Sequence, residues 1–159
     1  MGPQAKEKIR LLISDVDGVL TDGHLFWTAE GNVMKVFHYR DGLGFKEAKA
    51  MGLKIAFVSA GPGQDVLESR ARHLGLDYVF ANVSDKVAAV ESILRQEDLA
   101  WENVAYIGDD TPDLECLKRA GYSFCPSDAV EEIKSIVHQE LKTPGGKGCI
   151  RDLVQYLKS

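Results

Sequence analysis

Acidic side chains gather at two places in this chain, and their spacing suggests metal chemistry. Asp15 and Asp17 are separated by one residue, while Asp109 and Asp110 are adjacent and Asp113 follows one helical turn later. Carboxylates held close together repel one another, so such a group is unfavourable unless a proton or a cation lies between them. Carboxylate oxygens are ligands that Mg²⁺ prefers, often together with water and a substrate phosphate. The spacing therefore predicts a magnesium site.

Each of these residues also has a structural interpretation when it is taken alone. The Asp15-Val16-Asp17 sequence could be a solvated turn, and Asp is favoured as the N-cap of a helix. Capping explains one acid after Gly108, but it explains two adjacent acids and a third one turn later poorly. Ser59 could simply begin a turn, and a lone lysine such as Lys86 is usually solvated. The acids, the serine and the lysine together indicate a catalytic site far more specifically than any one of them does.

Short apolar runs alternate with amphipathic segments, which predicts a parallel sheet covered by helices on both faces. The predicted strands are Ile9–Val16, Lys54–Ser59, Tyr78–Phe80, Val104–Ile107 and a weaker one at Tyr122–Phe124. The predicted helices lie within residues 45–51, 66–74, 84–94, 114–118, 130–137 and 150–157. Ser84 is the expected N-cap of the third helix. This pattern indicates a single α/β domain of Rossmann-like type over residues 1–159.

Two segments interrupt the alternation. Residues 24–39 are rich in β-forming side chains on both sides of the turn sequence Ala29-Glu30-Gly31, which predicts a β-hairpin inserted after the first strand. A glycine-rich tail begins near residue 144 and leads into the last helix, so the tail and helix together cover about residues 144–159. No composition shift or linker along the chain marks a second domain.

Polar residues that could bind a ligand or take part in catalysis follow the predicted strands. Ligands in open α/β folds bind beyond the carboxyl ends of the strands. The residues at those ends are Asp15, Asp17, Ser59, Asp109 and Asp110, with Lys86 at a nearby helix start. An acid cluster, a hydroxyl and a lysine are what phosphoryl transfer needs, because its catalysis is positioning plus charge neutralisation. One carboxylate can act as nucleophile, and a second can protonate the leaving alcohol.

Composition narrows the class of protein further. The 159 residues carry a formal charge of −5, which argues against nucleic acid or an anionic membrane as the main partner. No apolar run approaches the roughly 20 residues that a membrane span requires. Cys116, Cys125 and Cys149 form neither a CxxC pair nor a zinc pattern and are expected to be reduced thiols. A cytoplasmic protein is therefore expected.

The motifs resemble those of phosphatases of the haloacid dehalogenase superfamily. The matching segments, in motif order, are Asp15-Val16-Asp17-Gly18-Val19, Ser59, Lys86 and Gly108-Asp109-Asp110 with Asp113. The resemblance implies that Asp15 is the nucleophile, which forms an aspartyl-phosphate, and that Asp17 is the general acid and base. It implies that Ser59 and Lys86 bind the transferred phosphate, with Lys86 also holding the nucleophile.

The same resemblance implies a Mg²⁺ cofactor and a set of ligands for it. The side chains of Asp15 and Asp109 and the main-chain carbonyl of Asp17 would bind the ion. Asp110 and Asp113 would support these ligands without touching the metal.

Further segments resemble one subgroup that has no cap domain, the phosphatases of 3-deoxy-D-manno-octulosonate 8-phosphate and of related nonulosonate 9-phosphates. These segments are Leu20-Thr21-Asp22-Gly23, Arg40-Asp41-Gly42-Leu43-Gly44, Gly145-Gly146-Lys147-Gly148 and Arg151-Asp152. The resemblance implies a homotetramer in which hairpins pack together and a neighbouring subunit completes each site. Arg40 and Lys147 are candidate substrate-binding residues, although either could equally be a surface or subunit contact.

Two departures leave the substrate open. The subgroup usually has Thr or Ser, Gly and then Arg after the second strand, whereas Ser59-Ala60-Gly61-Pro62-Gly63 offers no arginine to pair with a substrate carboxylate. Lys147 stands where Arg is common. A phosphatase of another small phosphate ester is thus one alternative, and a catalytically silent scaffold or regulatory protein is another. A receiver domain also phosphorylates an Asp at a strand end, but it gives no reason for Asp17 or the hairpin.

Overall fold

Six parallel strands form the central sheet, which confirms the predicted α/β class. In the computed structural model, which describes residues 6–159, the strand order is β5-β4-β1-β6-β7-β8. The strands are β1 (Leu11–Ser14), β4 (Lys54–Val58), β5 (Tyr78–Phe80), β6 (Val104–Ile107), β7 (Tyr122–Cys125) and β8 (Gln139–Glu140). Leu12 pairs with Ile55 on one side and Ala105 on the other, so the first strand lies inside the sheet. A strand buried on both faces needs the continuous apolar run that the sequence has there.

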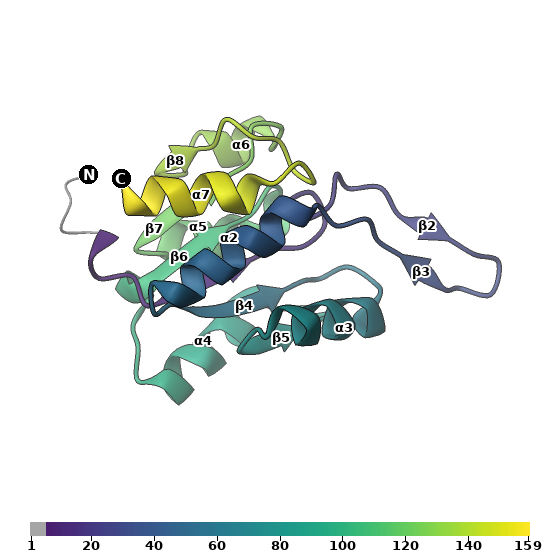
Figure 1. The fold of residues 1–159 in the computed structure, drawn as a ribbon, viewed down its shortest axis with the longest axis horizontal. Coiled ribbons are helices and arrows are strands. Elements are labelled where there is room, and N and C mark those ends of the chain that lie inside the picture. The colour runs from purple at the N-terminus through teal and green to yellow at the C-terminus, as the bar shows by residue number, and fades with distance from the viewer. Residues whose placement is uncertain (1–5) are drawn as a thin grey trace.

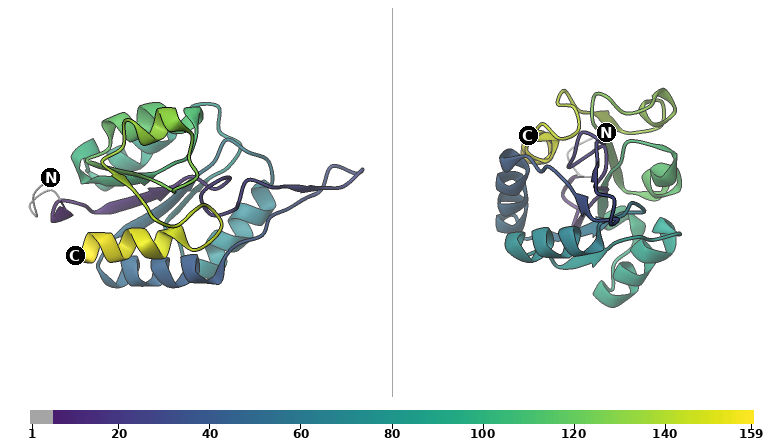
Figure 2. Two further views of the ribbon diagram at one scale, coloured as in Figure 1. Left: turned by 90° about the horizontal axis from the view of Figure 1, so that it is seen from above. Right: turned by 90° about the vertical axis from the view of Figure 1, so that its right-hand side faces the viewer.

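Helices cover both faces of the sheet, as predicted (Figures 1 and 2). The helices on one face are α2 (Tyr39–Ala50), α3 (Gln64–Leu74) and α7 (Cys149–Lys158), and those on the other are α4 (Lys86–Glu97), α5 (Leu114–Arg119) and α6 (Glu131–Lys134). Phe45, Leu67 and Leu153 pack in the first apolar layer. Val90 and Leu117 pack in the second. The sheet is thus fixed between two cores, and only its ends are free to carry a site.

The predicted hairpin exists, but its paired region is shorter than expected. Only β2 (Phe26–Trp27) and β3 (Val33–Met34) pair, in antiparallel register, and the arm projects from the body of the molecule (Figure 1). The turn closes at Gly31, whose φ of +84° suits glycine. The prediction that the hairpin reaches Tyr39 was wrong, because His38 accepts a hydrogen bond from the backbone N–H of Arg40 and begins α2.

Other elements also differ from the predictions. The N-cap of α4 is Asp85 rather than Ser84, because the Asp85 carboxylate accepts the N–H of Ala88 at 2.9 Å. The helix expected over residues 130–137 is a single turn, α6. The edge strand β8 was not predicted, because its two residues, Gln139 and Glu140, are polar and give no apolar signal.

The connection after β4 decides how open the site is. The strand ends at Val58 and α3 begins at Gln64, so residues 59–63 join them directly and no domain is inserted there. Within residues 6–159, every helix is too short or too polar to cross a lipid bilayer.

Candidate active site

The carboxyl ends of β1, β4 and β6 surround a pocket of about 210 Å³. Its lining residues are Asp15, Asp17, Ala60, Gly61, Lys86, Asp109, Asp110, Pro112 and Asp113. Larger hollows of about 510 Å³ near Tyr156 and about 640 Å³ near Trp101 lie elsewhere on the surface. Polar side chains from several strand ends converge only in the smaller of these three pockets. We therefore place the candidate site there, on the basis of its lining residues and not of its volume.

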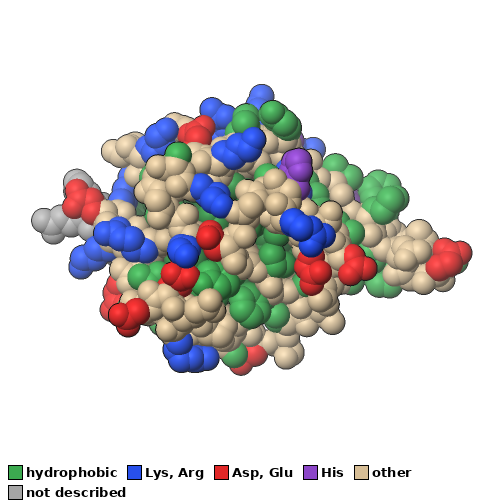
Figure 3. Space-filling view, turned by 60° about the horizontal axis from the view of Figure 1, so that its bottom comes forward, with side chains coloured by type: hydrophobic (Ala, Val, Ile, Leu, Met, Phe, Trp, Pro, Cys, Tyr) green, Lys and Arg blue, Asp and Glu red, His purple; other side chains and the backbone are tan. Residues whose placement is uncertain are grey.

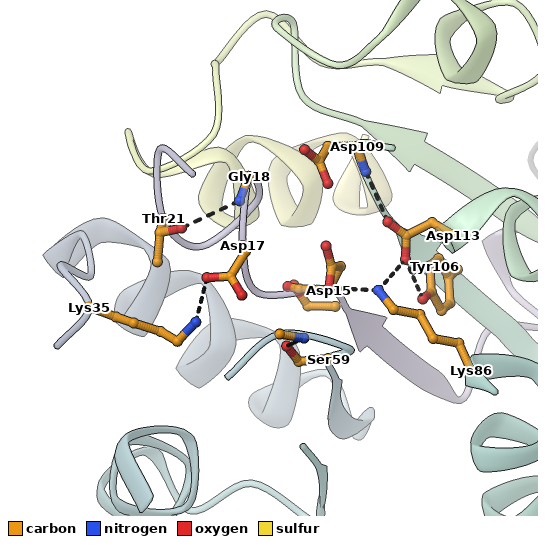
Figure 4. Close-up of polar contacts among 12 residues, drawn as sticks. Asp15, Asp17, Gly18, Thr21, Lys35, Ser59, Lys86, Tyr106, Asp109 and Asp113 are labelled. Atoms are coloured by element: carbon orange, nitrogen blue, oxygen red, sulfur yellow. Dashed lines mark hydrogen bonds and ion pairs between the residues drawn. The ribbon is translucent and has the colours of Figure 1, made fainter. Parts of the chain in front are cut away.

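Lys86 is the central cation of the pocket (Figure 4). Its Nζ lies 2.7 Å from Oδ1 of Asp15 and 2.7 Å from Oδ1 of Asp113, and all three side chains are buried. Tyr106 also donates its hydroxyl to Oδ1 of Asp113, at 2.7 Å. Burial alone would lower the pKa of Lys86, but the charges of Asp15 and Asp113 outweigh burial and raise it. The ammonium therefore stays charged and fixes one oxygen of Asp15.

Three carboxylates crowd together around this lysine. Oxygen atoms of Asp15, Asp109 and Asp113 lie within 4.8 Å of one another. Burial, reinforced by the charge of Asp113, raises the pKa of Asp15 well above its usual value. The same two causes raise the pKa of Asp109 to about 7. Among these groups one ammonium faces three acids, so the cluster favours taking up a proton or a cation.

The donor set of the cluster fits a magnesium ion, and its members are not equivalent. Carboxylate oxygens are the hard ligands that Mg²⁺ prefers. Both oxygens of Asp113 are already engaged, since Oδ1 accepts from Lys86 and Tyr106 and Oδ2 accepts the N–H of Asp109 at 3.3 Å. Asp15 and Asp109 are thus better placed to hold a cation, with Asp113 behind them.

Gly18 allows the backbone after β1 to approach this cluster. Its φ is +86°, and a Cβ at this position would lie 1.9 Å from Oδ2 of Asp109. No side chain fits there, so the glycine of the Asp-x-Asp-Gly segment brings the two acidic segments together. Asp110 instead bonds locally, because its side chain accepts the N–H of Thr111 at the start of the 3₁₀ turn η2 (Thr111–Asp113). Its capping interpretation therefore holds.

Asp17 has a partner that sequence reasoning missed. Its Oδ1 lies 2.5 Å from Nζ of Lys35, which comes from the hairpin. The Lys35 side chain is 0% exposed and that of Asp17 is 26% exposed. The signal was present in the sequence, since Lys35 stands between the apolar residues Met34 and Val36. Period-2 alternation then sends the lysine to the opposite face from its neighbours. Tyr106, inside an apolar strand, was also missed.

Ser59 lies where predicted, directly after β4. It is fully buried, and its Oγ accepts the N–H of Gly61 at 3.2 Å beneath the loop of residues 59–63. It is close to the pocket but does not line it in this single chain. Its role as a phosphate ligand stays a prediction.

Arg40 and Lys147 do not line the pocket in this single chain. Arg40 lies in the first turn of α2 rather than on the hairpin. The glycine-rich tail packs against that turn, since a Cβ at Gly148 would lie 2.9 Å from Cβ of Arg40. Gly146 donates its N–H to the carbonyl of Val19 at 2.9 Å, which anchors the tail on the loop after β1. Substrate contacts by Arg40 and Lys147 stay predictions.

Comparison with known proteins gives the same family over most of the chain. The family model described as haloacid dehalogenase-like hydrolase matches residues 59–148. The 3-deoxy-D-manno-octulosonate 8-phosphate phosphatase KdsC of Haemophilus influenzae is 39% identical over 150 residues, which are 94% of this chain and 83% of that protein.

Two solved structures extend this likeness to three dimensions. The cobalt-bound form of the Haemophilus influenzae phosphatase has a TM-score of 0.92 at 38% identity and covers 97% of this chain and 90% of that one. The Moraxella catarrhalis phosphatase, in complex with magnesium, phosphate and KDO, has a TM-score of 0.92 at 28% identity, covering 98% and 88%. The chain therefore belongs to the haloacid dehalogenase-like hydrolases, and it is an enzyme of the phosphatase class.

Proposed function

We propose that this phosphatase is Mg²⁺-dependent and hydrolyses a phosphorylated keto-deoxy sugar acid through an aspartyl-phosphate intermediate. The substrate would be 3-deoxy-D-manno-octulosonate 8-phosphate or a nonulosonate 9-phosphate. The observation that carries the proposal is the pairing of Oδ1 of Asp15 with Lys86 at the wall of the pocket, because it orients the carboxylate while Oδ2 remains available as the nucleophile. The similar proteins that act on the octulosonate ester supply the substrate class.

The residues of the pocket suit the two chemical steps of such a reaction. Asp15 Oδ2 attacks phosphorus, the bond to the sugar oxygen breaks, and Asp17 gives its proton to the leaving alkoxide. Asp17 then takes a proton from water, which attacks the acyl phosphate and regenerates the Asp15 carboxylate and inorganic phosphate. Lys86 keeps Asp15 oriented throughout and offsets charge on the transferred group.

Magnesium would be held by the side chains of Asp15 and Asp109 and by the carbonyl of Asp17. When bound, the ion would neutralise the charge of the phosphate group, which Lys86 alone cannot balance beside three acids. Asp113 would keep these ligands in place, as the hydrogen bond from the Asp109 N–H to its side chain suggests. Asp110 would support them through its cap on η2, which fixes the segment that follows Asp109.

Phosphate release from a panel of esters tests the proposal. Octulosonate 8-phosphate, a nonulosonate 9-phosphate and several ordinary sugar phosphates are compared with and without Mg²⁺. One keto-sugar acid is expected to exceed the ordinary esters by about a hundredfold in kcat/KM, which is roughly 2.7 kcal/mol of transition-state discrimination. Chelation by EDTA is expected to remove the activity, and Mg²⁺ to restore it.

A second candidate substrate class follows from one residue. Gly61 stands where the subgroup usually has arginine, so the loop after β4 has no guanidinium group that could bind a substrate carboxylate through two hydrogen bonds. If turnover needs Mg²⁺ but is indifferent to the ester, the enzyme is a phosphatase of other small phosphates. Release that is independent of Mg²⁺ would contradict the mechanism itself.

We also propose that the protein forms a homotetramer through its hairpins, with a neighbour helping to close each site. Phe26, Trp27, Met34 and Val36 are exposed on the arm, and Trp27 is 62% exposed. Figure 3 shows hydrophobic side chains, in green, on the side of the molecule from which the arm projects. Large apolar side chains clustered on a projecting arm are typical of an interface. Arg40 and Lys147 would then contact substrate in a site that includes a neighbouring subunit.

Replacement of Trp27 by aspartate tests this assembly. Light scattering is expected to give four times the chain mass for the wild type and a smaller species for Trp27→Asp, because a charge would be buried in the apolar contact. Met51→Asp is the matched control, since Met51 is also apolar and exposed but lies away from the hairpin. A wild-type protein that is monomeric at micromolar concentration would contradict the proposal.

A further inference from the structure

The hairpin presents two different faces. Met34 and Val36 point outward and are exposed, whereas Lys35 between them is buried and extends toward Asp17. Figure 4 shows the Lys35 side chain reaching from the hairpin to Asp17. A buried ion pair contributes little net stability compared with apolar side chains of the same size, because both charges lose water. A contribution to fold stability therefore does not by itself explain why a lysine is buried at this position.

The stem of Lys35 is held along its path. A Cβ at Gly63 would lie 3.1 Å from Cε of Lys35, so the loop after β4 packs directly on the lysine stem. Nζ then lies 2.5 Å from Oδ1 of Asp17, within reach of a charge-assisted hydrogen bond. The hairpin and the loop together fix the position of the ammonium.

The two oxygens of Asp17 consequently have different surroundings. Oδ1 is bound by Lys35, while Oδ2 lies beside Gly61, where a Cβ would be only 2.2 Å away. Asp17 and Gly61 both line the pocket, whereas Lys35 does not. Lys35 therefore touches Asp17 from behind, and Oδ2 is the oxygen on the pocket side.

We propose that Lys35 is a positioning residue that holds Asp17 by Oδ1, so that Oδ2 is the atom that exchanges protons with the leaving alcohol and with water. The inference rests on the proposed role of Asp17 as general acid and base. Proton transfer needs the two heavy atoms within hydrogen-bond reach, so a carboxylate that rotates freely would be a poorer acid and base. The hairpin, which we propose as the contact between subunits, would thus also align a catalytic group.

A leaving-group comparison tests the proposal. An alkyl phosphate such as a sugar phosphate needs a proton on its leaving oxygen, whereas p-nitrophenyl phosphate releases nitrophenolate without one. Lys35→Met keeps the length of the stem and removes the ammonium. It is expected to lower kcat for the alkyl ester by about 100-fold, the lower end for loss of general acid–base catalysis.

The first turnover with p-nitrophenyl phosphate gives a readout that a structural role would not move. Its nitrophenolate release is expected to stay within about fivefold of wild type, while the later steps, which need Asp17 as a base, become slow. The variant should therefore show a burst of nitrophenolate followed by a slow steady state. Lys118→Met, which removes a surface lysine paired with Glu115, is the matched control and should behave as wild type.

Two further variants keep the test decisive. Lys35→Met combined with Asp17→Asn should be no slower than Asp17→Asn alone, because the two residues act as one unit. Gly61→Ala displaces Oδ2 of Asp17 directly, so it should show the same dependence on the leaving group. This variant tests the proposal even if Lys35→Met folds poorly. Equal losses on both esters without a burst, or additive effects in the double variant, would overturn the proposal. Asp15→Asn tests the proposed function separately, because it stops the first turnover with either ester.

Discussion

Asp15→Asn is expected to abolish phosphate release while leaving the protein folded. An amide cannot form the aspartyl-phosphate, and removal of an enzymatic nucleophile typically lowers kcat by about 10⁴-fold or more. The geometry around the residue is preserved, because asparagine is isosteric with aspartate and its side-chain oxygen can still accept from Lys86. Phosphate release under single-turnover conditions measures the loss, and wild-type release in this variant would contradict the nucleophile assignment.

The same substitution is expected to stabilise the metal-free protein at neutral pH. Burial raises the pKa of Asp15 well above its usual value, so the ionised carboxylate is less favourable in the folded than in the unfolded chain. This penalty is absent at low pH and grows as pH rises through the ordinary pKa of aspartate, near 4. Urea unfolding in EDTA should therefore give a higher midpoint for Asp15→Asn than for wild type at pH 7, and a smaller difference near pH 4. Glu102→Gln, at an exposed acid away from the site, is the control.

The fold was predictable where burial is complete and continuous. The residues of β1 and β6 are all buried, and such strands require the unbroken apolar runs that the sequence has there. The edge strand β8 has no such requirement, because two polar residues at the margin pair through backbone alone. The hairpin was predictable in kind but not in length, since the point at which β3 stops pairing depends on the capping of α2 by His38.

The grouping of the acids was predictable for a topological reason. Parallel strands bring their carboxyl ends to one edge of the sheet, so Asp15 and Asp109 had to lie close once β1 and β6 were adjacent. The pairing of Lys35 with Asp17 has no such origin, because it depends on how the hairpin leaves the sheet. Tyr106 was hidden for the opposite reason, as an aromatic residue inside a strand looks like core until its hydroxyl is seen to reach Asp113.

The charged residues of the site form two separate groups, each with its own lysine. Lys35 serves Asp17 at the hairpin side of the pocket, while Lys86 serves Asp15 and Asp113 in its floor. The second group already has two acids for one ammonium, and Asp109 adds a third acid. Lys86 should thus matter for stability as well as catalysis, which distinguishes it from a lysine that only meets the substrate.

Lys86→Met is accordingly expected to destabilise the metal-free protein by about 3–5 kcal/mol, the usual result of removing one partner from a buried ion pair. Activity should fall with it, because Asp15 loses the group that orients it. Urea unfolding at pH 7 in EDTA measures the free energy of unfolding, and Lys118→Met, which removes a surface lysine, should change it by less than about 1 kcal/mol.

Two additions should each recover part of the stability lost in Lys86→Met, and they separate the electrostatic explanation from a packing defect. Lower pH protonates the crowded acids. In the wild type the charge of Lys86 partly offsets the burial and repulsion that raise the pKa values of Asp15 and Asp109, so without Lys86 their ionised forms are still less favourable. The variant should therefore gain on wild type as pH falls from 7 toward 5. Mg²⁺ should act in the same direction at pH 7 by binding to the acids of the folded state. A deficit that neither protons nor Mg²⁺ reduce would mean that the lysine stem, rather than its charge, supports the fold. In that case the acid cluster would not need a cation at all, and the basis for placing magnesium there would be lost.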